Sequence, residues 1–226
     1  MEEAPSDASG HRARLRQRLF EGGGGALLDH ELVEYLLALA IPRRDTKAKA
    51  KALIARFGGI GPLLSADADT LRREGLSDGV IGALKIAEAS ALRMLETRID
   101  GRPILSSWDA LGDYLQAAMA NQAIEQVRVL FLNAKNMLIA NEAMWTGSVD
   151  EASVHVREII ARAIALGATA IIIVHNHPSG DPTPSQADIR LTRDLIDAGR
   201  HMKIAVHDHV IVGAQGRSSL KAMGLI

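Results

Sequence analysis

The sequence predicts a mixed α/β fold class, in which a small all-helical domain is followed by a larger α/β domain. Up to about residue 100, apolar residues recur in short segments at the spacing of helices. Strand patterns begin only after residues 100–103, an Asp-Gly-Arg-Pro segment that is typical of a linker. Residues 170–174 are uniformly apolar and rich in β-branched side chains, which indicates a central strand buried on both faces.

The N-terminal part is predicted to begin with a mobile polar tail over residues 1–25, because this segment opens with polar residues, continues through a basic stretch and ends in four consecutive glycines. An all-helical domain is predicted over residues 26–100. Capping side chains, proline and paired glycines set the ends of its helices. In chain order these are expected at residues 29–42, 46–57, 62–64, 67–74 and 80–98.

The C-terminal part is predicted to be an α/β domain over residues 104–226. Helical and strand patterns alternate along it, and an Asn-Ala-Lys-Asn segment between its first two strands indicates a hairpin turn. Its expected elements are a helix at 108–119, strands at 127–131 and 137–145, a helix opening at Ser153, the strand at 170–174, a helix at 185–199, and strands at 204–206 and 210–212.

Composition and charge limit the classes of function. The 226 residues carry 26 Lys and Arg against 27 Asp and Glu, a net charge of −1, which is unlike the strongly basic surface of a dedicated nucleic-acid-binding protein. The chain has no cysteine, which excludes disulfides, thiolate metal sites and a cysteine nucleophile. Any metal ion is therefore expected to be bound by histidine and carboxylate side chains.

Membrane and targeting segments are not predicted. The longest uncharged apolar stretch, residues 163–174, is shorter than the roughly 20 residues needed to span a bilayer. The first residues are acidic and polar, unlike those of a signal or transit peptide. We therefore expect a cytoplasmic protein without membrane contact.

Histidines cluster where the predicted central strand ends. His175 and His177 follow this strand directly, and residues at i and i+2 of an extended segment point to one side. Two imidazoles placed in this way can bind one metal ion. Five of the eight histidines lie between residues 175 and 209, so a metal site is first sought here.

Ser185 and Asp188 open the helix that follows. Taken alone, Ser-x-x-Asp is a good helix start, and a single histidine at a strand end is usually structural. Together the residues form His-x-His-x7-Ser-x2-Asp, and four residue types at fixed spacing are rarely met by chance. His175, His177 and Asp188 would give a site suited to one Zn²⁺ ion, with a fourth position open to water, which is the catalytic rather than the structural pattern.

This string resembles the JAMM motif of the JAB/MPN metalloprotease family. The longer run of residues 175–188, with its intact His-Asn-His-Pro-Ser-Gly-Asp-Pro-Thr-Pro-Ser, resembles the bacterial RadC family, and the resemblance extends over about residues 12–224. It implies a JAB/MPN-type domain and a zinc-dependent hydrolase that cleaves a peptide or isopeptide bond of a peptide or protein substrate with a metal-activated water. It also implies that His175, His177 and Asp188 bind the metal, while Ser185 hydrogen-bonds the oxyanion of the tetrahedral intermediate.

In that family an acidic residue on an earlier strand completes the site, and Glu142 takes this position here. The resemblance gives Glu142 the role of the base, which takes a proton from water and passes it to the leaving nitrogen. Glu151 and Glu158 are alternatives from the residues alone. Glu142 is preferred because it lies on a predicted strand, whereas the other two lie at or on an amphipathic helix.

His207 and His209 form a second His-x-His pattern. The surrounding residues alternate as a strand, so both imidazoles are expected on one side of it. Three roles are possible for these histidines and for Asp208 between them: they bind the metal directly, they orient its ligands, or they are structural. A structural role is favoured.

The N-terminal domain resembles a helix-hairpin-helix module, which grips the DNA backbone through a glycine-rich hairpin. The hairpin would lie at residues 74–79, where Ser77 replaces the second glycine of the usual Gly-hydrophobic-Gly pattern. A solvated helix face explains the nearby basic residues most simply, and weak DNA contact is the alternative. These basic residues are Arg43, Arg44, Lys47, Lys49, Lys51 and Arg56. The competing function is a DNA-associated, repair-related binding protein whose second domain is a scaffold.

Overall fold

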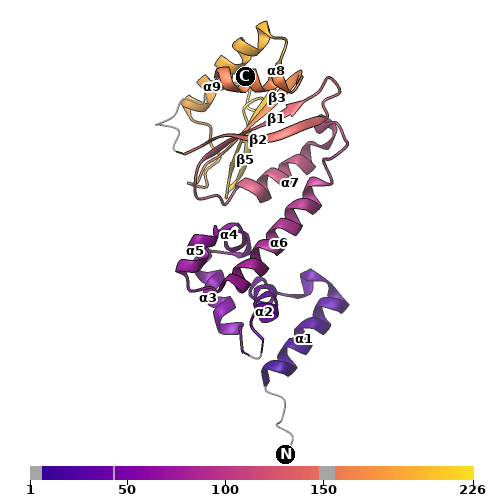
Figure 1. The fold of residues 1–226 in the computed structure, drawn as a ribbon, viewed down its shortest axis with the longest axis vertical. Helices are drawn as coiled ribbons and strands as arrows, with labels where there is room; N and C mark the ends of the chain where they lie inside the picture. The colour runs from indigo at the N-terminus through magenta and orange to yellow at the C-terminus, as the bar shows by residue number, and fades with distance from the viewer. Residues whose placement is uncertain (1–6, 43, 148–155) are drawn as a thin grey trace, which may run out of the picture. The chain divides into compact units, whose positions relative to one another are not determined.

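The computed structural model describes residues 7–42, 44–147 and 156–226, and the chain divides into two compact units, residues 1–91 and 92–226 (Figure 1). The first unit is helical, and the second contains a β-sheet with helices on both of its faces. The predicted fold class, an all-helical part followed by a mixed α/β part, is confirmed.

The helical unit buries the apolar faces of short helices against one another. Its helices are α1 (Asp7–Gly22), α2 (Asp29–Ala40), α3 (Lys47–Phe57), α4 (Ile60–Ser65), α5 (Ala68–Arg73) and the first part of α6 (Asp78–Glu96). Gly58 ends α3 at a φ of 80°, a left-handed conformation that glycine adopts without strain, and its N–H bonds the carbonyl of Ile54. The core of this unit includes Val33, Leu37, Ala50, Leu53, Leu63, Leu71, Val80 and Leu84.

The predicted mobile tail over residues 1–25 does not match the structure, because residues 7–22 form helix α1. Leu15 on this helix is 1% exposed, and Nη1 of Arg18 lies 2.7 Å from Oε1 of Glu31 on α2. Helix α1 is otherwise polar and largely exposed, so no periodic apolar pattern marks it in the sequence.

The boundary between the two units lies between residues 91 and 92, within α6, whereas the sequence places a linker near residues 101–103. The residues around the predicted linker belong to the second unit, in whose core Ile99 and Ile104 are buried. Gly101, at a φ of 66°, and Pro103 therefore mark a turn and not a domain boundary.

The second unit is built on a five-stranded sheet in the described part of the chain, with the strand order β2-β1-β3-β4-β5 (Figure 1). Strands β3 and β4 are parallel, and the other neighbouring strands are antiparallel. The strands are β1 (Gln126–Leu132), β2 (Leu138–Thr146), β3 (Ala170–Asn176), β4 (Ala205–Gly213) and β5 (Gly216–Ser219). The helices that pack on the sheet are α7 (Trp108–Met119), α8 (Val156–Ala165) and α9 (Gln186–His201).

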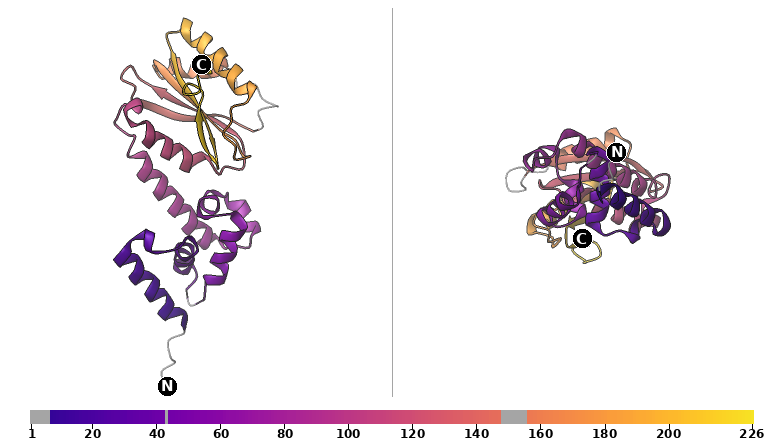
Figure 2. Two further views of the ribbon diagram at one scale, coloured as in Figure 1. Left: turned by 180° about the vertical axis from the view of Figure 1, so that it is seen from behind. Right: turned by 90° about the horizontal axis from the view of Figure 1, so that it is seen from below.

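The side chains of β3 alternate between the two faces of the sheet. Ile172 and Val174 join the core under α7, whereas Ile171 and Ile173 join the core under α8 and α9, and the two ribbon views show these helices on opposite sides of the sheet (Figure 2). His175 is in phase with Ile171 and Ile173. Its imidazole therefore leaves the strand on the face that α8 and α9 cover.

Three details of the second unit differ from the prediction or lie outside the described residues. The segments expected at 204–206 and 210–212 are parts of one strand, β4. Strand β5 is not among the predicted strands, because its Gly-Arg-Ser-Ser sequence carries no apolar alternation. The helix start expected at Ser153 lies outside the described residues, which show α8 from Val156 onwards.

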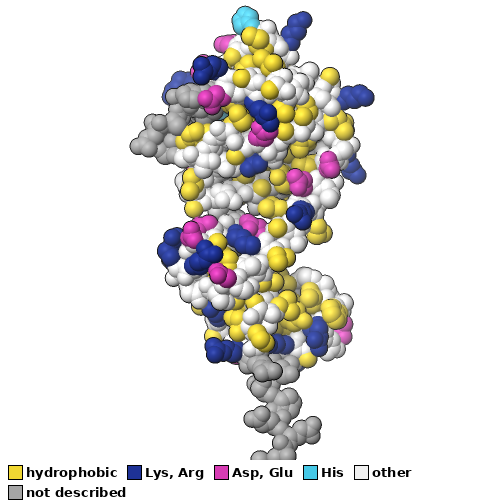
Figure 3. Space-filling view, viewed as in Figure 1, with side chains coloured by type: hydrophobic (Ala, Val, Ile, Leu, Met, Phe, Trp, Pro, Cys, Tyr) yellow, Lys and Arg dark blue, Asp and Glu magenta, His cyan; other side chains and the backbone are white. Residues whose placement is uncertain are grey.

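Acidic and basic side chains are mixed on the face of the molecule that Figure 3 shows, in agreement with the net charge of −1. None of the helices within the described residues has both the length and the hydropathy required to span a membrane.

Candidate metal centre

His175 lies near the end of β3 and is 1% exposed. Both of its ring nitrogens face carboxylates: Nδ1 lies 2.9 Å from Oδ1 of Asp188, and Nε2 lies 2.6 Å from Oε1 of Glu125. A neutral imidazole carries a single N–H and can donate to only one of these carboxylates. The other contact requires an additional proton or a cation, so this arrangement favours the binding of a cation.

Asp188 lies in the first turn of α9 and is fixed by Ser185, the residue that caps the helix. The hydroxyl of Ser185 donates to Oδ2 of Asp188 at 2.6 Å, and the backbone N–H of Ser185 donates to the same oxygen at 2.7 Å. The backbone N–H of Asp188 returns a bond to Ser185 Oγ, which completes a capping box. Burial opposes ionisation of Asp188, but hydrogen bonds from His175, His177 and Ser185 outweigh it and hold the pKa of Asp188 well below its usual range.

His177 follows β3 and is oriented by the loop of residues 178–184. Its Nδ1 lies 2.8 Å from the carbonyl oxygen of Asp181, so Nδ1 carries a hydrogen and donates it. Its Nε2 lies 3.6 Å from Oδ2 of Asp188. The interaction with Asp188 raises the pKa of His177, although burial acts in the opposite direction. The loop thus leaves Nε2, the nitrogen suited to metal binding, directed at the carboxylate.

The structure brings together four of the five residues that the sequence predicts for the site, namely His175, His177, Ser185 and Asp188. It does not bring Glu142 to them. The Glu142 carboxylate is bound by Arg162 of α8, with Oε1 2.6 Å from Nη2 and Oε2 2.8 Å from Nε, and this hydrogen bonding lowers the pKa of Glu142.

Strand order explains why Glu142 does not lie beside His175. Glu142 lies on β2, and β1 separates β2 from β3, so a whole strand stands between Glu142 and the strand that carries His175. Of the two alternatives, Glu158 is exposed on α8, and Glu151 lies outside the described residues.

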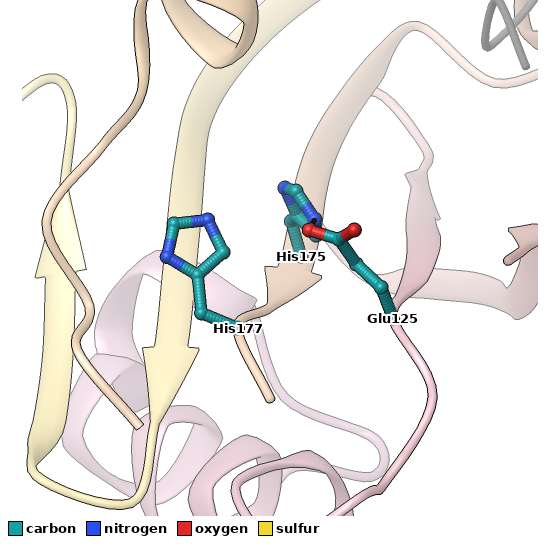
Figure 4. Close-up of side chains that lie close together, drawn as sticks. All are labelled: Glu125, His175 and His177. Atoms are coloured by element: carbon teal, nitrogen blue, oxygen red, sulfur yellow. Dashed lines mark hydrogen bonds and ion pairs between the residues drawn. The ribbon is translucent and has the colours of Figure 1, made fainter. Parts of the chain in front are cut away.

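Glu125 is the carboxylate that the sequence analysis missed. It directly precedes β1, and Figure 4 shows its carboxylate against the ring of His175, with His177 on the other side of that ring in this view. Strand β1 runs antiparallel to β3 with Val127 opposite His175, so residues just before β1 lie beside the end of β3. The sequence carries one signal for Glu125: it is an acidic residue directly before a strand that pairs antiparallel with the strand of His175.

His209 of β4 is a third buried imidazole in this region, with its ring centroid 6.2 Å from that of His175. The hydroxyl of Thr192 donates its hydrogen to the carbonyl of Asp188 at 2.6 Å. The oxygen of the same hydroxyl lies 2.7 Å from Nδ1 of His209, so it accepts the hydrogen that this nitrogen carries. His209 Nε2 is then left with a lone pair, and it is buried without a hydrogen-bond partner among the described residues. Burial lowers the pKa of His209 to about 3, which keeps the ring neutral.

His207 does not lie beside His209, contrary to the expectation that both imidazoles share one side. The pairing of β3 with β4 shifts between Val206 and Asp208, so His207 is an extra residue of a bulge. Nε2 of His207 lies 2.7 Å from Oδ1 of Asn136, in the turn that follows β1.

The donor atoms fit a zinc ion. Within the described residues, two overlapping sets offer ligand atoms that all lie within 4.8 Å of one another: Glu125 with His175 and His177, and His175 with Asp188 and His209. Imidazole nitrogens and carboxylate oxygens are the usual ligands of catalytic zinc, and the buried lone pair of His209 Nε2 adds a further acceptor to this region.

Residues 105–225 match the model of the family described as RadC-like JAB domain. The matched range contains all five strands of the sheet and every side chain of the candidate metal centre, whereas helices α1 to α6 lie outside it.

Proposed function

The chain belongs to the RadC-like JAB domain family, and on this premise we propose that it is a zinc-dependent metallohydrolase that cleaves a peptide or isopeptide bond. One observation carries the proposal. Glu125, which lies outside the His-x-His-x7-Ser-x2-Asp string, has its carboxylate 2.6 Å from His175, and this contact supports a base beside the proposed metal ligands.

His175, His177 and Asp188 are the residues that would hold the zinc ion. The hydrogen bonds around them support this assignment. Nδ1 of His177 donates to the carbonyl of Asp181, and Oδ2 of Asp188 accepts the backbone N–H of Ser185, so both side chains are held in orientation. When bound, zinc supplies Lewis-acid chemistry, which lowers the pKa of water and polarises the carbonyl of the scissile bond.

Glu125, in place of Glu142, acts as the proton carrier in this proposal. Its carboxylate accepts a proton from the attacking water and returns it to the leaving nitrogen, so that the amine departs neutral. The C–N bond breaks, the carbonyl carbon gains the oxygen of water, and the atoms balance without any further reactant. The carboxylate lies 2.6 Å from His175, a proposed metal ligand, and this closeness supports its part in both transfers.

Ser185 is proposed to have two roles. Its contacts support the first, since its hydroxyl and backbone N–H hold Asp188 in the orientation described above. The second, a hydrogen bond to the oxyanion, requires the hydroxyl to turn from Oδ2 of Asp188 to the substrate. A single oxyanion donor of this kind is typically worth about 3 kcal/mol of transition-state stabilisation.

The proposed function is tested by metal analysis and by cleavage on the same preparations. Purified full-length protein is expected to contain one zinc per chain and to cleave members of a library of peptides and lysine isopeptides, detected by mass spectrometry. Glu125→Gln is expected to keep its zinc and lose roughly 10²–10⁴-fold in rate, because it retains the size of the side chain without its basicity. A protein without zinc, or a Glu125→Gln variant with unchanged cleavage, would contradict the proposal.

A further inference from the structure

We propose that Asn176 is a positioning residue that holds the segment on both sides of Glu125, so that the Glu125 carboxylate reaches His175. The inference rests on the proposed function, in which Glu125 carries the proton. It concerns a residue that lies between two metal ligands in the sequence but takes no part in ligation.

The side-chain hydrogen bonds of Asn176 go to residues 122–126, the segment that leads into β1. Its side-chain oxygen accepts the backbone N–H of Gln126 at 2.8 Å. Its side-chain nitrogen donates to the carbonyl of Ile124 at 3.2 Å and, more weakly, to that of Gln122 at 3.5 Å. The residues immediately before and after Glu125 are therefore both bound by the same amide group.

The position of Asn176 on β3 explains how it reaches this segment. Asn176 is in phase with Ile172 and Val174, so its side chain leaves the strand on the α7 face, opposite to that of His175. The chain passes from the end of α7 to the start of β1 through residues 120–125 on that side. Two consecutive residues of β3 thus serve the two parts of the site, one as a ligand and the next as a support for the base.

An amide is the group that this position requires. Asn176 is 0% exposed, and buried backbone N–H and carbonyl groups need hydrogen-bond partners. Asparagine offers an acceptor to Gln126 and a donor to Ile124 at the same time. Aspartate keeps the acceptor but loses the donor, and leucine, which has a similar size, loses both.

The backbone of Glu125 has a further anchor. Its carbonyl accepts the backbone N–H of Gly147, just after β2, at 2.9 Å. With both neighbours held by Asn176 and its own carbonyl held by Gly147, the backbone of Glu125 is fixed on each side. Displacements of about 1 Å at a reacting group can cost about 10²-fold in rate, so loss of this support is expected to act on catalysis.

The first test measures the segment directly and needs no substrate. In zinc-loaded full-length protein, hydrogen–deuterium exchange of the Gln126 amide is expected to be slow. It is expected to rise at least about tenfold in Asn176→Leu, which removes the acceptor, while zinc content stays at one per chain. Unchanged exchange in Asn176→Leu would overturn the inference whatever the activity of the protein.

The second test separates a positioning role from a merely structural one. Asn176→Asp is expected to lose about 10–10²-fold in kcat with little change in KM on the isopeptide or peptide cleaved by the wild type. In a Glu125→Gln background the same substitution is expected to cost nothing further, because the group that it positions is gone. An equal loss in both backgrounds, or no loss in either, would contradict the proposal.

Asn133→Asp is the matched control. The side-chain oxygen of Asn133 accepts the backbone N–H groups of Lys135 and Met137 at 2.8 and 3.1 Å, so this asparagine also fixes a connecting segment, at the other end of β1. Aspartate keeps this acceptor oxygen, so the substitution is expected to leave the segment in place and kcat unchanged. If Glu125→Gln alone retains full activity, the proposed function fails; if Glu125→Gln is inactive and Asn176→Asp is fully active, only the inference about Asn176 fails.

Discussion

Glu125 and His175 are 50 residues apart in the chain, yet Oε1 of the first lies 2.6 Å from Nε2 of the second. The contact follows from the antiparallel pairing of β1 with β3, in which Val127 stands opposite His175. The base and the metal ligands of the proposed site are therefore joined by strand pairing, and the motif that carries the ligands does not contain the base.

Replacement of Glu142 by Gln is expected to leave zinc content and hydrolysis unchanged. Glu142 is partly exposed and paired with Arg162, and an ion pair of this kind contributes within about 1 kcal/mol to stability. Urea unfolding and cleavage rate, measured on the same preparation, check this. A rate loss as large as that of Glu125→Gln would return Glu142 to the mechanism.

The two His-x-His patterns are expected to differ in zinc binding. His175→Ala removes one of three proposed ligands and is expected to abolish stoichiometric zinc, because two remaining ligands bind weakly. His207→Ala is expected to keep one zinc per chain, since His207 contacts Asn136 and not the site. Zinc retained in His175→Ala and lost in His207→Ala, by elemental analysis of dialysed protein, would reverse the assignment.

Thr192→Val is expected to destabilise the protein by about 1–3 kcal/mol, because it leaves the buried N–H of His209 without an acceptor. Thr192→Ser keeps the hydroxyl and serves as the control, with a smaller loss expected from the missing methyl group. Denaturant unfolding of both variants checks the prediction. Equal stability of Thr192→Val and the wild type would show that the hydroxyl is not needed to satisfy His209.

Glu31 is expected to make the helical unit less stable in acid. The hydrogen bond from Arg18, with a further bond from the Leu28 backbone N–H, lowers the pKa of Glu31 to about 2. The folded-state pKa lies below that of the unfolded chain, near 4.3, so the stabilisation is complete above about pH 5 and is lost as the pH falls towards 2.

The measurement is the difference in unfolding free energy between the wild type and Glu31→Gln. This difference is expected to be about 1 kcal/mol at pH 7 and to shrink steadily below pH 5. Glu21→Gln, on exposed α1 where Glu21 contacts Gln17, is the control. A difference for Glu31→Gln that grows as the pH falls would contradict the assignment.

DNA binding through the helical unit stays a prediction, and it is expected to be weak. Arg44, Lys47 and Lys51 are exposed at or near α3, and Arg43 of the same basic run lies outside the described residues. Replacing the three exposed residues by Gln is expected to lower affinity for duplex DNA and to reduce the slope of log affinity against log salt by up to about 3. Fluorescence anisotropy at several salt concentrations measures both. Tight binding at physiological salt, unaffected by the three substitutions, would refute the charge argument.

Much of the local structure could be predicted from the sequence. The helix expected at residues 108–119 is α7, with the same ends, because a serine precedes it and its apolar residues keep one face. The strand at 170–174 is β3, extended by two residues, since an uninterrupted β-branched run suits only a central strand. Ser185 and Asp188 begin α9 through the expected capping interaction.

The missing parts depend on contacts between distant residues. Helix α1 is stabilised by the buried Leu15 and by Arg18 with its partner on α2, and neither contact leaves a periodic pattern. The choice between Glu142 and Glu125 depends on which strand lies beside β3, and the sequence pattern of β1 and β2 is compatible with either neighbour. The bulge at His207 likewise arises only from the pairing of β4 with β3.

The alternation along β3 limits which insertions and deletions this chain can accept. One residue added or removed between residues 170 and 174 would exchange the faces: an insertion would bring Val174, and a deletion Asn176, to the place where His175 meets Asp188. An insertion or deletion of two residues would return each side chain to its original face of the sheet. It would also shift the histidines about 7 Å along the strand, away from the end of β1. The length of this strand is therefore as much a determinant of the site as the identity of its side chains, and variation in chain length belongs in the loops.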